Sequence, residues 1–359
     1  MSDFPLPPGA AIGVIGGGQL GRMLALAASR LGFDSVFLEP EPDSPASRVA
    51  RHTIVAAYDD PEALKALAAI ASVVTFEFEN VPASAVAQLA AMGIEVAPGP
   101  LALATAQDRV AEKTFLNANG APTVAFAAAD SAETAVDAVT RIGAPCLMKT
   151  RREGYDGKGQ RWVEHAHDAA AAFEALGGVP VIVEAAADFV RELSVIAARG
   201  RDGATAVYPL AENHHEHGIL RRSVAPARVT PAMADQAERI AARILSGLDY
   251  VGVIGIELFE MADGSLLVNE FAPRVHNSGH WTQDGCGVDQ FEQHIRAVAG
   301  WPLGSTTAVA QVEMLNLLGD EIDAWPRYAA EPETRLHLYG KRDAKPGRKM
   351  GHINRVRPL

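Results

Sequence analysis

Two glutamates in the second half of the chain, Glu257 and Glu270, are spaced so that one tight turn would bring their carboxylates together. The segments on either side of Asp263-Gly264 are rich in apolar residues. An Asp-Gly pair between two such segments predicts a β-hairpin with a two-residue loop. In that register, Glu257 and Glu270 face each other across the two strands.

The same register surrounds the two carboxylates with the apolar side chains of Phe259, Met261, Leu266 and Val268. Carboxylates held opposite each other repel, so in an apolar strip they need a proton or a cation between them. Mg²⁺ binds carboxylate oxygens and usually keeps waters and substrate phosphates in its shell. We therefore expect a divalent-metal site that receives a phosphorylated ligand; a shared proton or a solvated strand edge is the alternative.

Other polar stretches suit the same ligand. Residues 274–281, RVHNSGHW, are typical of small-anion recognition, with a capping loop as the alternative. Lys149 ends an apolar strand, where its ammonium can reach phosphate oxygens, with a solvated strand end as the alternative. Residues 153–160, EGYDGKGQ, suit either a flap over phosphates or a hairpin turn of mixed charge. The chain lacks G-x-x-x-x-G-K-[ST], so it is not a P-loop enzyme.

A glycine turn near the N-terminus indicates a different ligand. Gly16, Gly18 and Gly21 fit G-x-G-x-x-G between a strand and a helix, and Glu39 ends the next strand, where a ribose-binding acid would lie. Glycines, however, let the backbone approach any anion at a helix N-terminus. The turn alone leaves open a nicotinamide dehydrogenase, another polar substrate, or close packing of strand and helix.

The elements that must position these residues change along the chain. Up to the break at 98–100, strands alternate with helices, which predicts a parallel, doubly wound α/β sheet. Beyond residue 191, extended segments dominate, which predicts an α+β unit on an antiparallel sheet. Strands are expected at 11–15, 35–38, 73–76, 94–97, 146–149, 161–163, 181–184, 193–197, 204–208, 252–260 and 265–271. Helices are expected at 20–31, 61–70, 83–91, 101–119, 131–142, 168–176, 231–246 and 290–299.

Bulk properties exclude several classes of protein. A chain of 359 residues suggests two or three domains. Its formal net charge of −12 disfavours general nucleic-acid binding. Two distant cysteines, Cys146 and Cys286, favour a reducing compartment. The absence of a signal peptide or a long apolar run also leads us to expect a cytoplasmic protein without membrane contact.

The C-terminal tail carries a basic cluster in this acidic chain. Its members are Lys341, Arg342, Lys345, Arg348 and Lys349. A charge run is usually a solvated surface, but the neighbouring 346–347 Pro-Gly pair and 350–353 MGHI stretch favour ordered structure. A local basic cluster can bind an anionic substrate.

Together these stretches resemble the ATP-grasp superfamily and, within it, the N5-carboxyaminoimidazole ribonucleotide synthetase family. The resemblance is carried by GGGQLGRM at 16–23, TFEFENV at 75–81, GYDGKGQ at 154–160, NEFAPRVHNSGH at 269–280 and PGRKMGH at 346–352. It implies an ATP-grasp fold behind a Rossmann-like (pre-ATP-grasp) parallel-sheet domain. The implied parts are the Rossmann-like domain at 1–105, a small subdomain at 106–187, and a large subdomain at 188–359 whose tail binds the substrate phosphate.

The resemblance also implies an ATP and metal site. Glu184 and the backbone after it would read adenine, and Glu192 the ribose. Glu257 and Glu270 would bind Mg²⁺ or Mn²⁺. Many ATP-grasp enzymes carry Asn where Ala272 stands, so water or phosphate oxygens would complete the metal shell. The residues implied to contact ATP are Arg109, Lys149, Gly154, Tyr155, Asp156, Gly157, Lys158, Gly159, Gln160, Glu184, Ala185, Ala186, Ala187, Glu192, His215, Asn269 and Glu270.

The other two substrates have implied sites as well. Arg274, His276 and Asn277 would surround bicarbonate and the carboxyphosphate made from it, with Lys149 as a fourth catalytic residue. Lys341 and Arg348 would bind the 5′-phosphate of aminoimidazole ribonucleotide. The residues implied to contact this ribonucleotide are Gln19, Leu20, Glu77, Tyr155, Lys158, Lys341 and Arg348.

The implied reaction is ATP-dependent carboxylation of aminoimidazole ribonucleotide with bicarbonate in de novo purine biosynthesis, by a homodimer that binds small molecules only. The nearest alternative is another ATP-grasp ligase, such as a formate-dependent glycinamide ribonucleotide transformylase. A nicotinamide dehydrogenase and a non-catalytic ATP-binding regulator belong to other classes.

Overall fold

The computed structural model describes residues 3–154 and 159–359, so Tyr155, Asp156, Gly157 and Lys158 of the predicted flap lie outside the described residues. The N-terminal unit is the parallel sheet that the α/β alternation predicted, in the order β3-β2-β1-β4. The predicted strand at 94–97 is reduced to a bridge between Val96 and Val74. The elements are β1 (Ala11–Ile15), α1 (Gln19–Arg30), β2 (Asp34–Leu38), β3 (His52–Ile54), α2 (Pro61–Ile70), β4 (Val73–Phe76), α3 (Ala83–Ala91) and α4 (Pro100–Ala106).

The second unit is a small antiparallel sheet in the order β5-β8-β6-β7. The helix expected over 101–119 is in fact two helices, because Asp108 accepts hydrogen bonds from the backbone N–H groups of Val110 and Ala111 and so begins a new helix. The elements are α5 (Arg109–Ala118), β5 (Phe126–Ala129), α6 (Ala132–Ile142), β6 (Cys146–Thr150), β7 (Gln160–Val163), η1 (Ala166–Asp168), α7 (Ala169–Ala175) and β8 (Val181–Ala185).

The third unit is a long antiparallel sheet in the order β14-β13-β9-β11-β12-β15-β17-β16, with β10 paired to β9. Its strands are β9 (Phe189–Arg199), β10 (Thr205–Val207), β11 (Ala211–Glu216), β12 (Ile219–Ala225), β13 (Gly252–Met261), β14 (Leu266–Ala272), β15 (Gln311–Leu318), β16 (Thr334–Leu338) and β17 (Lys349–Arg357). Its helices are α8 (Pro231–Gly247), η2 (Asn277–Gly279), α9 (Thr282–Gly285), α10 (Gln290–Val298), η3 (Gly319–Ala324) and α11 (Trp325–Ala329).

Alternation of side chains along β9 and β13 gives the long sheet two buried faces. Ile254 and Ile256 of β13 belong to the core with α8, whereas Val253 belongs to the core with Phe291 and Ile295 of α10. The α10 core also includes side chains of α1, so the N-terminal unit and the long sheet are packed together. Farther along β13, Glu257 lies on the same face as Val253.

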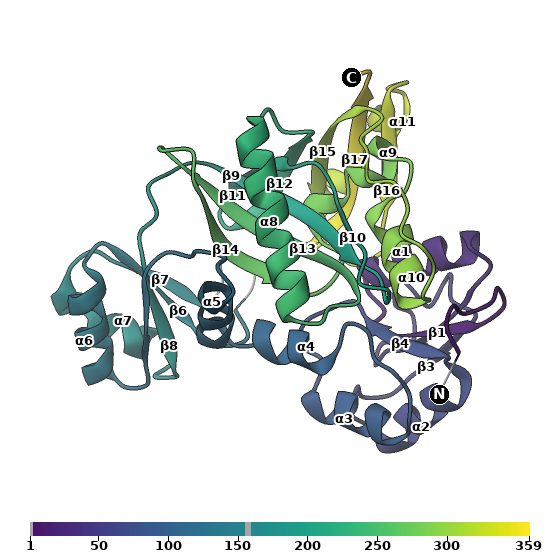
Figure 1. The fold of residues 1–359 in the computed structure, drawn as a ribbon, viewed down its shortest axis with the longest axis horizontal. Coiled ribbons are helices and arrows are strands. Elements are labelled where there is room, and N and C mark those ends of the chain that lie inside the picture. The colour runs from purple at the N-terminus through teal and green to yellow at the C-terminus, as the bar shows by residue number, and fades with distance from the viewer. Residues whose placement is uncertain (1–2, 155–158) are drawn as a thin grey trace.

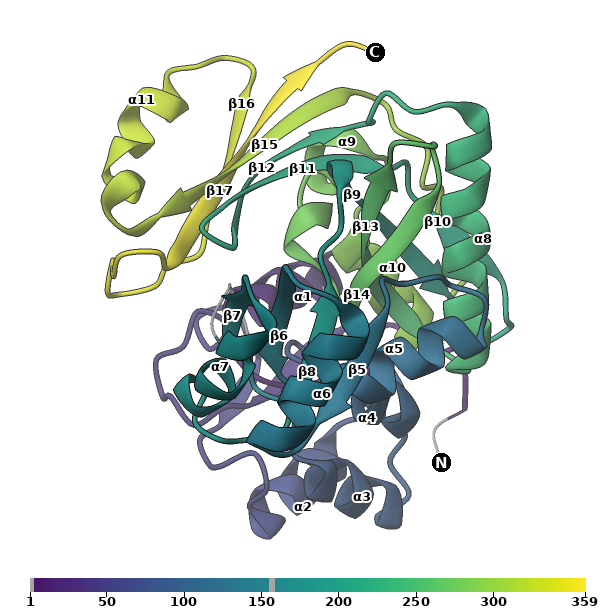
Figure 2. The ribbon, with the colours of Figure 1, turned by 90° about the vertical axis from the view of Figure 1, so that its left-hand side faces the viewer.

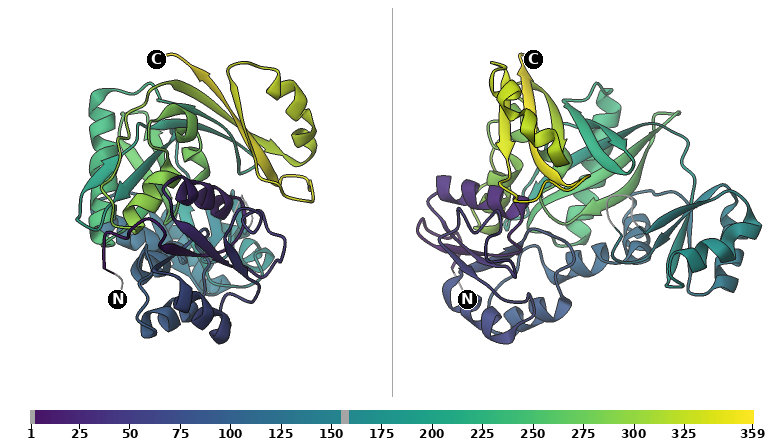
Figure 3. Two further views of the ribbon diagram at one scale, coloured as in Figure 1. Left: turned by 90° about the vertical axis from the view of Figure 1, so that its right-hand side faces the viewer. Right: turned by 180° about the vertical axis from the view of Figure 1, so that it is seen from behind.

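The three units form an extended molecule (Figure 1). The unit of β5–β8 stands at one end, with the N-terminal unit and β15–β17 toward the other, as the view from behind in Figure 3 also shows. Figure 2 shows β16 and β17 at the opposite edge from α2 and α3. No helix in residues 3–154 and 159–359 combines the length and apolar character that a membrane crossing requires.

Candidate active site

The hairpin of β13 and β14 pairs Glu257 directly with Glu270, as predicted, although the loop differs from the prediction. The loop has three residues, because the N–H of Met261 donates to the carbonyl of Ser265 (2.9 Å) and Gly264 adopts a φ of +80°. A bulge at Asn269, between the Glu257–Glu270 and Leu258–Val268 pairs, then shifts the register back by one residue. The two deviations cancel at the glutamates.

The bulge also changes which side chains surround the pair. Leu266 and Val268, predicted beside the carboxylates, lie on the opposite face in the core with α8. Phe259 pairs instead with Leu267, and both are half-buried on the glutamate face. The predicted apolar neighbour Phe259 on β13 is therefore confirmed, whereas on β14 the neighbour is Leu267 and not Leu266 or Val268, since one extra residue reverses the direction of every side chain beyond it.

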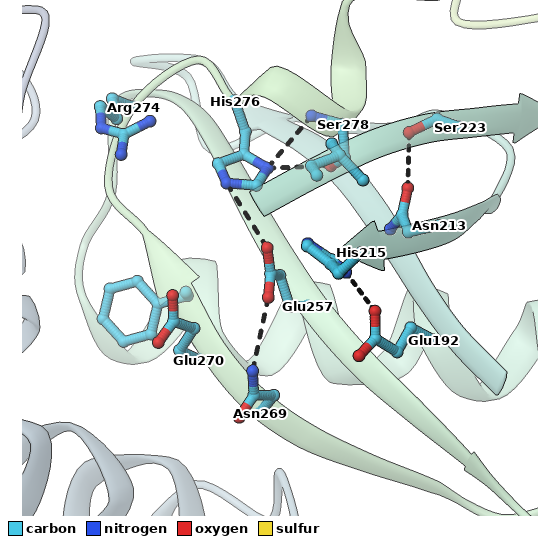
Figure 4. A network of polar contacts seen from close by, with 12 residues as sticks. Glu192, Asn213, His215, Ser223, Glu257, Asn269, Glu270, Arg274, His276 and Ser278 are labelled. Atoms are coloured by element: carbon cyan, nitrogen blue, oxygen red, sulfur yellow. Dashed lines mark hydrogen bonds and ion pairs between the residues drawn. The ribbon is translucent and has the colours of Figure 1, made fainter. Parts of the chain in front are cut away.

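The two carboxylates differ in pKa. Glu270 accepts a hydrogen bond from Nη1 of Arg109 (2.9 Å), and the charges of Arg109 and Lys149 outweigh burial and hold the pKa of Glu270 well below its usual range. Burial, with the charge of Glu270, raises the pKa of Glu257 to about 7. Among the described residues, Glu257 has two weak contacts, with Nδ2 of Asn269 at 3.4 Å and Nε2 of His276 at 3.7 Å (Figure 4).

This donor set suits a cation that also binds phosphate. A carboxylate with a raised pKa opposite a charged one is relieved when a cation lies between them. Within the described ranges, no group of three or more His, Cys, Asp or Glu side chains is arranged to bind a metal ion. Two carboxylates would then be the protein's ligands, and Mg²⁺ commonly takes the rest of its shell from water and substrate phosphates.

His276 and Asn277 extend the polar face beyond β14. Nδ1 of His276 accepts from the backbone N–H of Ser278 (3.4 Å) and lies 2.9 Å from its Oγ, which leaves the ring proton on Nε2, the atom turned toward Glu257. Burial, with the charge of Arg274, lowers the pKa of His276 to about 3, so the ring is neutral. Both polar side-chain atoms of Asn277 are buried without a hydrogen-bond partner among the described residues, as expected of groups that await a ligand.

The predicted residue Arg274 lies apart from the His276–Glu257 contact in Figure 4. Its Nε donates to Oε2 of Glu79 at 2.5 Å, and its Nη1 donates to the carbonyl of Val275 at 3.1 Å. Glu79 comes from the N-terminal unit, so this ion pair joins two units. The 75–81 motif contributed to the family resemblance, but sequence reasoning gave Glu79 no role.

Gln290, the first residue of α10, is a second residue that sequence reasoning missed. It is fully buried, its Oε1 accepts the N–H of His276 (2.9 Å), and its Nε2 donates to the carbonyl of His276 (2.8 Å) and lies 3.0 Å from Nδ1 of His280. Two glycines make room for the segment after β14 that carries His276. A Cβ on Gly279 would lie 2.6 Å from Oε1 of Gln290, and one on Gly255 would lie 2.4 Å from Cβ of His276.

A buried group of charges lies where β6, β8 and α5 meet. Glu184 pairs with Lys149 (2.8 Å) and with Lys113 (3.2 Å), and Lys113 also donates to the carbonyl of Asn269 (3.1 Å). Burial would raise the pKa of Glu184, but the two ammonium groups lower it overall. Lys113 was absent from the predicted set, since a lysine inside a helical pattern carries no sequence signal for burial.

The other predicted ATP contacts lie around this group. Arg109 Nη2 donates to the carbonyl of Gly154 (3.0 Å), and the Gly159 carbonyl accepts from Thr150 (2.8 Å), just before Gln160 begins β7. Ala185 ends β8, and Ala186 and Ala187 connect it to β9.

Glu192 and His215 form an ion pair on neighbouring strands of the long sheet (Figure 4). Burial disfavours the charged ring, but Glu192 and Glu257 raise the pKa of His215 overall. The pair lines a cavity of about 360 Å³. The residues lining this cavity are Phe189, Val190, Arg191, Glu192, Glu212, Asn213, His214, His215 and Arg222.

The glycine turn is occupied by the protein's own carboxylates. Glu77 accepts hydrogen bonds from the N–H groups of Gly18 and Gly21, the latter at 2.6 Å. Glu39 accepts from the N–H of Gly17 at 2.6 Å. A dinucleotide pyrophosphate would need these N–H groups and would be repelled by these acids, so the arrangement disfavours the dehydrogenase interpretation. Gln19 and Leu20 begin α1 directly beside the turn.

The basic tail lies against the N-terminal unit. Arg48 donates to the carbonyl of Gly340 at 2.8 Å, and Arg342 forms an ion pair with Asp43. Lys341 is close enough to Glu77 for its charge to lower the pKa of that acid, against the larger raising effect of burial. Arg348 donates to the carbonyl of Asp343 at 3.2 Å. The predicted ribonucleotide contacts Gln19, Glu77 and Lys341 are thus brought near one another.

Comparison with known proteins gives matches along the whole chain. Residues 10–107 match the ribonucleotide synthetase preATP-grasp domain, residues 114–291 the ATP-grasp domain, and residues 313–358 the phosphoribosylaminoimidazole carboxylase C-terminal domain. The N5-carboxyaminoimidazole ribonucleotide synthase of Brucella melitensis is 51% identical, covering 100% of this chain and 99% of the relative.

Solved structures are similarly close. The N5-carboxyaminoimidazole ribonucleotide synthetase of Thermus thermophilus has a TM-score of 0.91 and 45% identity, covering 96% of this chain and 93% of that one. The synthase of Aspergillus clavatus, solved with ADP and 5-aminoimidazole ribonucleotide, has a TM-score of 0.92 and 33% identity, covering 98% of this chain and 95% of that one.

Proposed function

Because this chain belongs to the N5-carboxyaminoimidazole ribonucleotide synthase family of ATP-grasp ligases, we propose that the face of β13 and β14 described above is where its reaction occurs. The enzyme carboxylates 5-aminoimidazole ribonucleotide with bicarbonate, using ATP and releasing ADP and phosphate, in purine biosynthesis. The observation that carries the assignment is the facing pair Glu257 and Glu270, with the unpartnered amide of Asn277 on the loop that follows.

We assign the metal to this pair. Glu257 and Glu270 would hold Mg²⁺ or Mn²⁺, and a bound ion would offset the negative charge of the ATP phosphates. Arg109 keeps Glu270 ionised, and a bound cation would favour the ionised form of Glu257, whose pKa is raised to about 7 by burial and by Glu270. Ala272 supplies no ligand, so phosphate and water oxygens would complete the shell.

ATP would lie between the second and third units, over β6, β8 and β9. Lys149 reaches the phosphates as a cation held in place by Glu184. Glu184, held beside Lys149 and Lys113, and the backbone of Ala185–Ala187 would read adenine. The cavity beside Glu192 and His215 has carboxylate and imidazole groups that suit ribose hydroxyls.

The reaction needs no side-chain nucleophile. An oxygen of bicarbonate attacks the γ-phosphorus and ADP departs, which forms carboxyphosphate. In carboxyphosphate, the bond between the carboxyl carbon and the oxygen that bridges to phosphorus then breaks, which gives CO₂ and phosphate. The amine of the ribonucleotide attacks CO₂, and the departing phosphate takes the amine proton. Charge develops on oxygen in the first two steps, where fixed cations and hydrogen-bond donors lower the barrier most.

Three residues of the 274–277 segment would meet those oxygens. Arg274 supplies a permanent positive charge with a planar set of N–H donors. His276 is neutral, so its Nε2–H donates one hydrogen bond without adding charge. The Asn277 amide, which has no partner among the described residues, offers both a donor and an acceptor.

The ribonucleotide would bind where the tail meets the glycine turn. Gln19, Leu20 and Glu77 would contact its sugar and base, and Lys341 and Arg348 its 5′-phosphate. The contacts of the tail with Arg48 and Asp43 support this placement. Tyr155 and Lys158, also assigned to this substrate, lie outside the described residues.

The two remaining expectations concern the cellular location and the oligomeric state of the enzyme. Both cysteines, Cys146 and Cys286, are free. Free thiols support the proposed cytoplasmic location, because disulfides are rare in reducing compartments. The homodimer implied by the family resemblance stays a prediction.

The function is tested by measuring ADP release with each substrate omitted in turn. We expect release to require ATP, bicarbonate and 5-aminoimidazole ribonucleotide together. Release that depends on formate and does not respond to this ribonucleotide would contradict the assignment.

A further inference from the structure

The segment after β4 crosses from the N-terminal unit to the predicted bicarbonate site. There the carboxylate of Glu79 meets Nε of Arg274 at 2.5 Å, with side-chain exposures of 31% and 17%. Such a largely buried, charge-assisted hydrogen bond is stronger than an exposed ion pair. The partner of Arg274 therefore comes from a distant part of the chain rather than from its own loop.

The backbone around Glu79 is fixed at more than one point. Nε2 of Gln107 donates to the carbonyls of Glu79 and Val81, both at 2.9 Å. Glu77, two residues earlier, is bound to the N–H groups of the glycine turn. The backbone position of Glu79 is therefore fixed by hydrogen bonds. A residue can orient another side chain only when its own position is fixed.

The geometry at Arg274 leaves part of its guanidinium for a ligand. An arginine has five N–H groups in a fixed plane. Among the described residues, Glu79 engages the one on Nε, and the carbonyl of Val275 engages one on Nη1. Holding the Nε edge fixes the plane of the group, so the direction of the remaining N–H groups is also fixed.

We propose that Glu79 is the positioning residue that orients Arg274 toward bicarbonate and carboxyphosphate. This role rests on the proposed function, because Arg274 has an anion to bind only if that reaction occurs. Glu79 acts through Arg274 and does not itself touch the substrates. The attraction between the two charges holds the pKa of Glu79 below its usual value despite burial, so the acid is ionised at neutral pH.

The test is the steady-state rate of ADP release by Glu79→Gln, which keeps the shape of the side chain and removes its charge. Since a misplacement of about 1 Å can lower a rate by about 10²-fold, we expect kcat/KM for bicarbonate to fall by about 10- to 100-fold. The KM for ATP should change much less, because the hydrogen bonds of Glu79 among the described residues go to Arg274 and Gln107 and to no predicted ATP contact. Glu79→Asp, which restores the charge on a shorter side chain, should recover part of the loss.

A double-mutant cycle separates positioning from general destabilisation. Arg274→Lys has no Nε–H for Glu79 to hold, so adding Glu79→Gln to it should lower activity by less than about twofold further. The control is Glu292→Gln, which weakens another ion pair between units, that with Arg30 at 2.8 Å; the hydrogen bonds of Glu292 among the described residues do not involve residues 274–277. That control should match the wild-type enzyme in kcat/KM for bicarbonate.

The outcomes distinguish this role from the function on which it rests. A wild-type enzyme whose ADP release ignores bicarbonate would overturn the function itself. A wild-type enzyme with the expected dependence, together with a Glu79→Gln variant within about twofold of it for bicarbonate, would overturn only the role of Glu79. Fully additive losses in the cycle, or equal rises in the KM for all substrates, would also overturn it.

Discussion

Replacing Gln290 with leucine should both lower the stability of the fold and displace His276. The side chain of Gln290 bonds the N–H and the carbonyl of His276 and also Nδ1 of the buried His280, so three groups would lose this partner. An orphaned buried polar group costs about 1–3 kcal/mol, so the three groups together should lower stability by about 3–9 kcal/mol. Displacement of His276 by about 1 Å should also lower kcat by about 10²-fold.

Gln293 on the same helix provides a matched control. It is also fully buried, and it bonds the N–H and carbonyl of Gly304 at 2.8 and 2.9 Å, away from the candidate site. Gln293→Leu should lower the thermal midpoint as Gln290→Leu does, yet keep its kcat at temperatures where both variants are folded. Thermal unfolding and ADP release would be measured on the two variants in parallel. Equal kcat values would refute the role given to Gln290.

Three other predictions concern the metal, the ribonucleotide and pH. Glu270→Gln should remove most turnover with little change in thermal midpoint, and unchanged activity at limiting Mg²⁺ would contradict the metal assignment. Arg348→Ala should raise the KM for the ribonucleotide far more than that for ATP; equal increases would show that the 5′-phosphate binds elsewhere. Burial, with the charge of Glu270, raises the pKa of Glu112 to about 8, so the folded protein keeps a proton that the unfolded chain loses. This contribution to stability is complete below the unfolded pKa near 4.5 and is lost as pH rises toward 8. In metal-free protein Glu112→Gln should flatten this decline in chemical denaturation, and an unchanged slope would argue against the raised pKa.

Local patterns predicted the elements well and their exact registers less well. The Asp-Gly signal correctly placed a hairpin around Glu257 and Glu270, because such a turn depends on a few neighbouring residues. It could not reveal the bulge at Asn269, whose offset depends on the packing of the whole sheet. Similarly, the periodicity of 101–119 suited one helix, and the competing signal was the capping residue Asp108.

Long-range partners explain what the sequence could not show about the site. The glycine turn fits a dinucleotide motif locally, and the acid that fills it, Glu77, directly follows β4, 56 residues beyond Gly21. Glu79, Lys113 and Gln290 bond groups that are distant in the sequence or across a loop, so no spacing rule identifies them. The segment of Arg274 and His276, in contrast, was visible as a dense polar run beside the predicted metal pair.

Crystals grown with Mn²⁺ and a non-hydrolysable ATP analogue would test the metal site directly, because the anomalous signal of Mn²⁺ locates the ion independently of the protein. We expect a peak within bonding distance of carboxylate oxygens from both Glu257 and Glu270 and of the analogue's phosphates. Bound analogue with no ion at these acids, or an ion held elsewhere in the chain, would contradict the placement of the reaction on this hairpin.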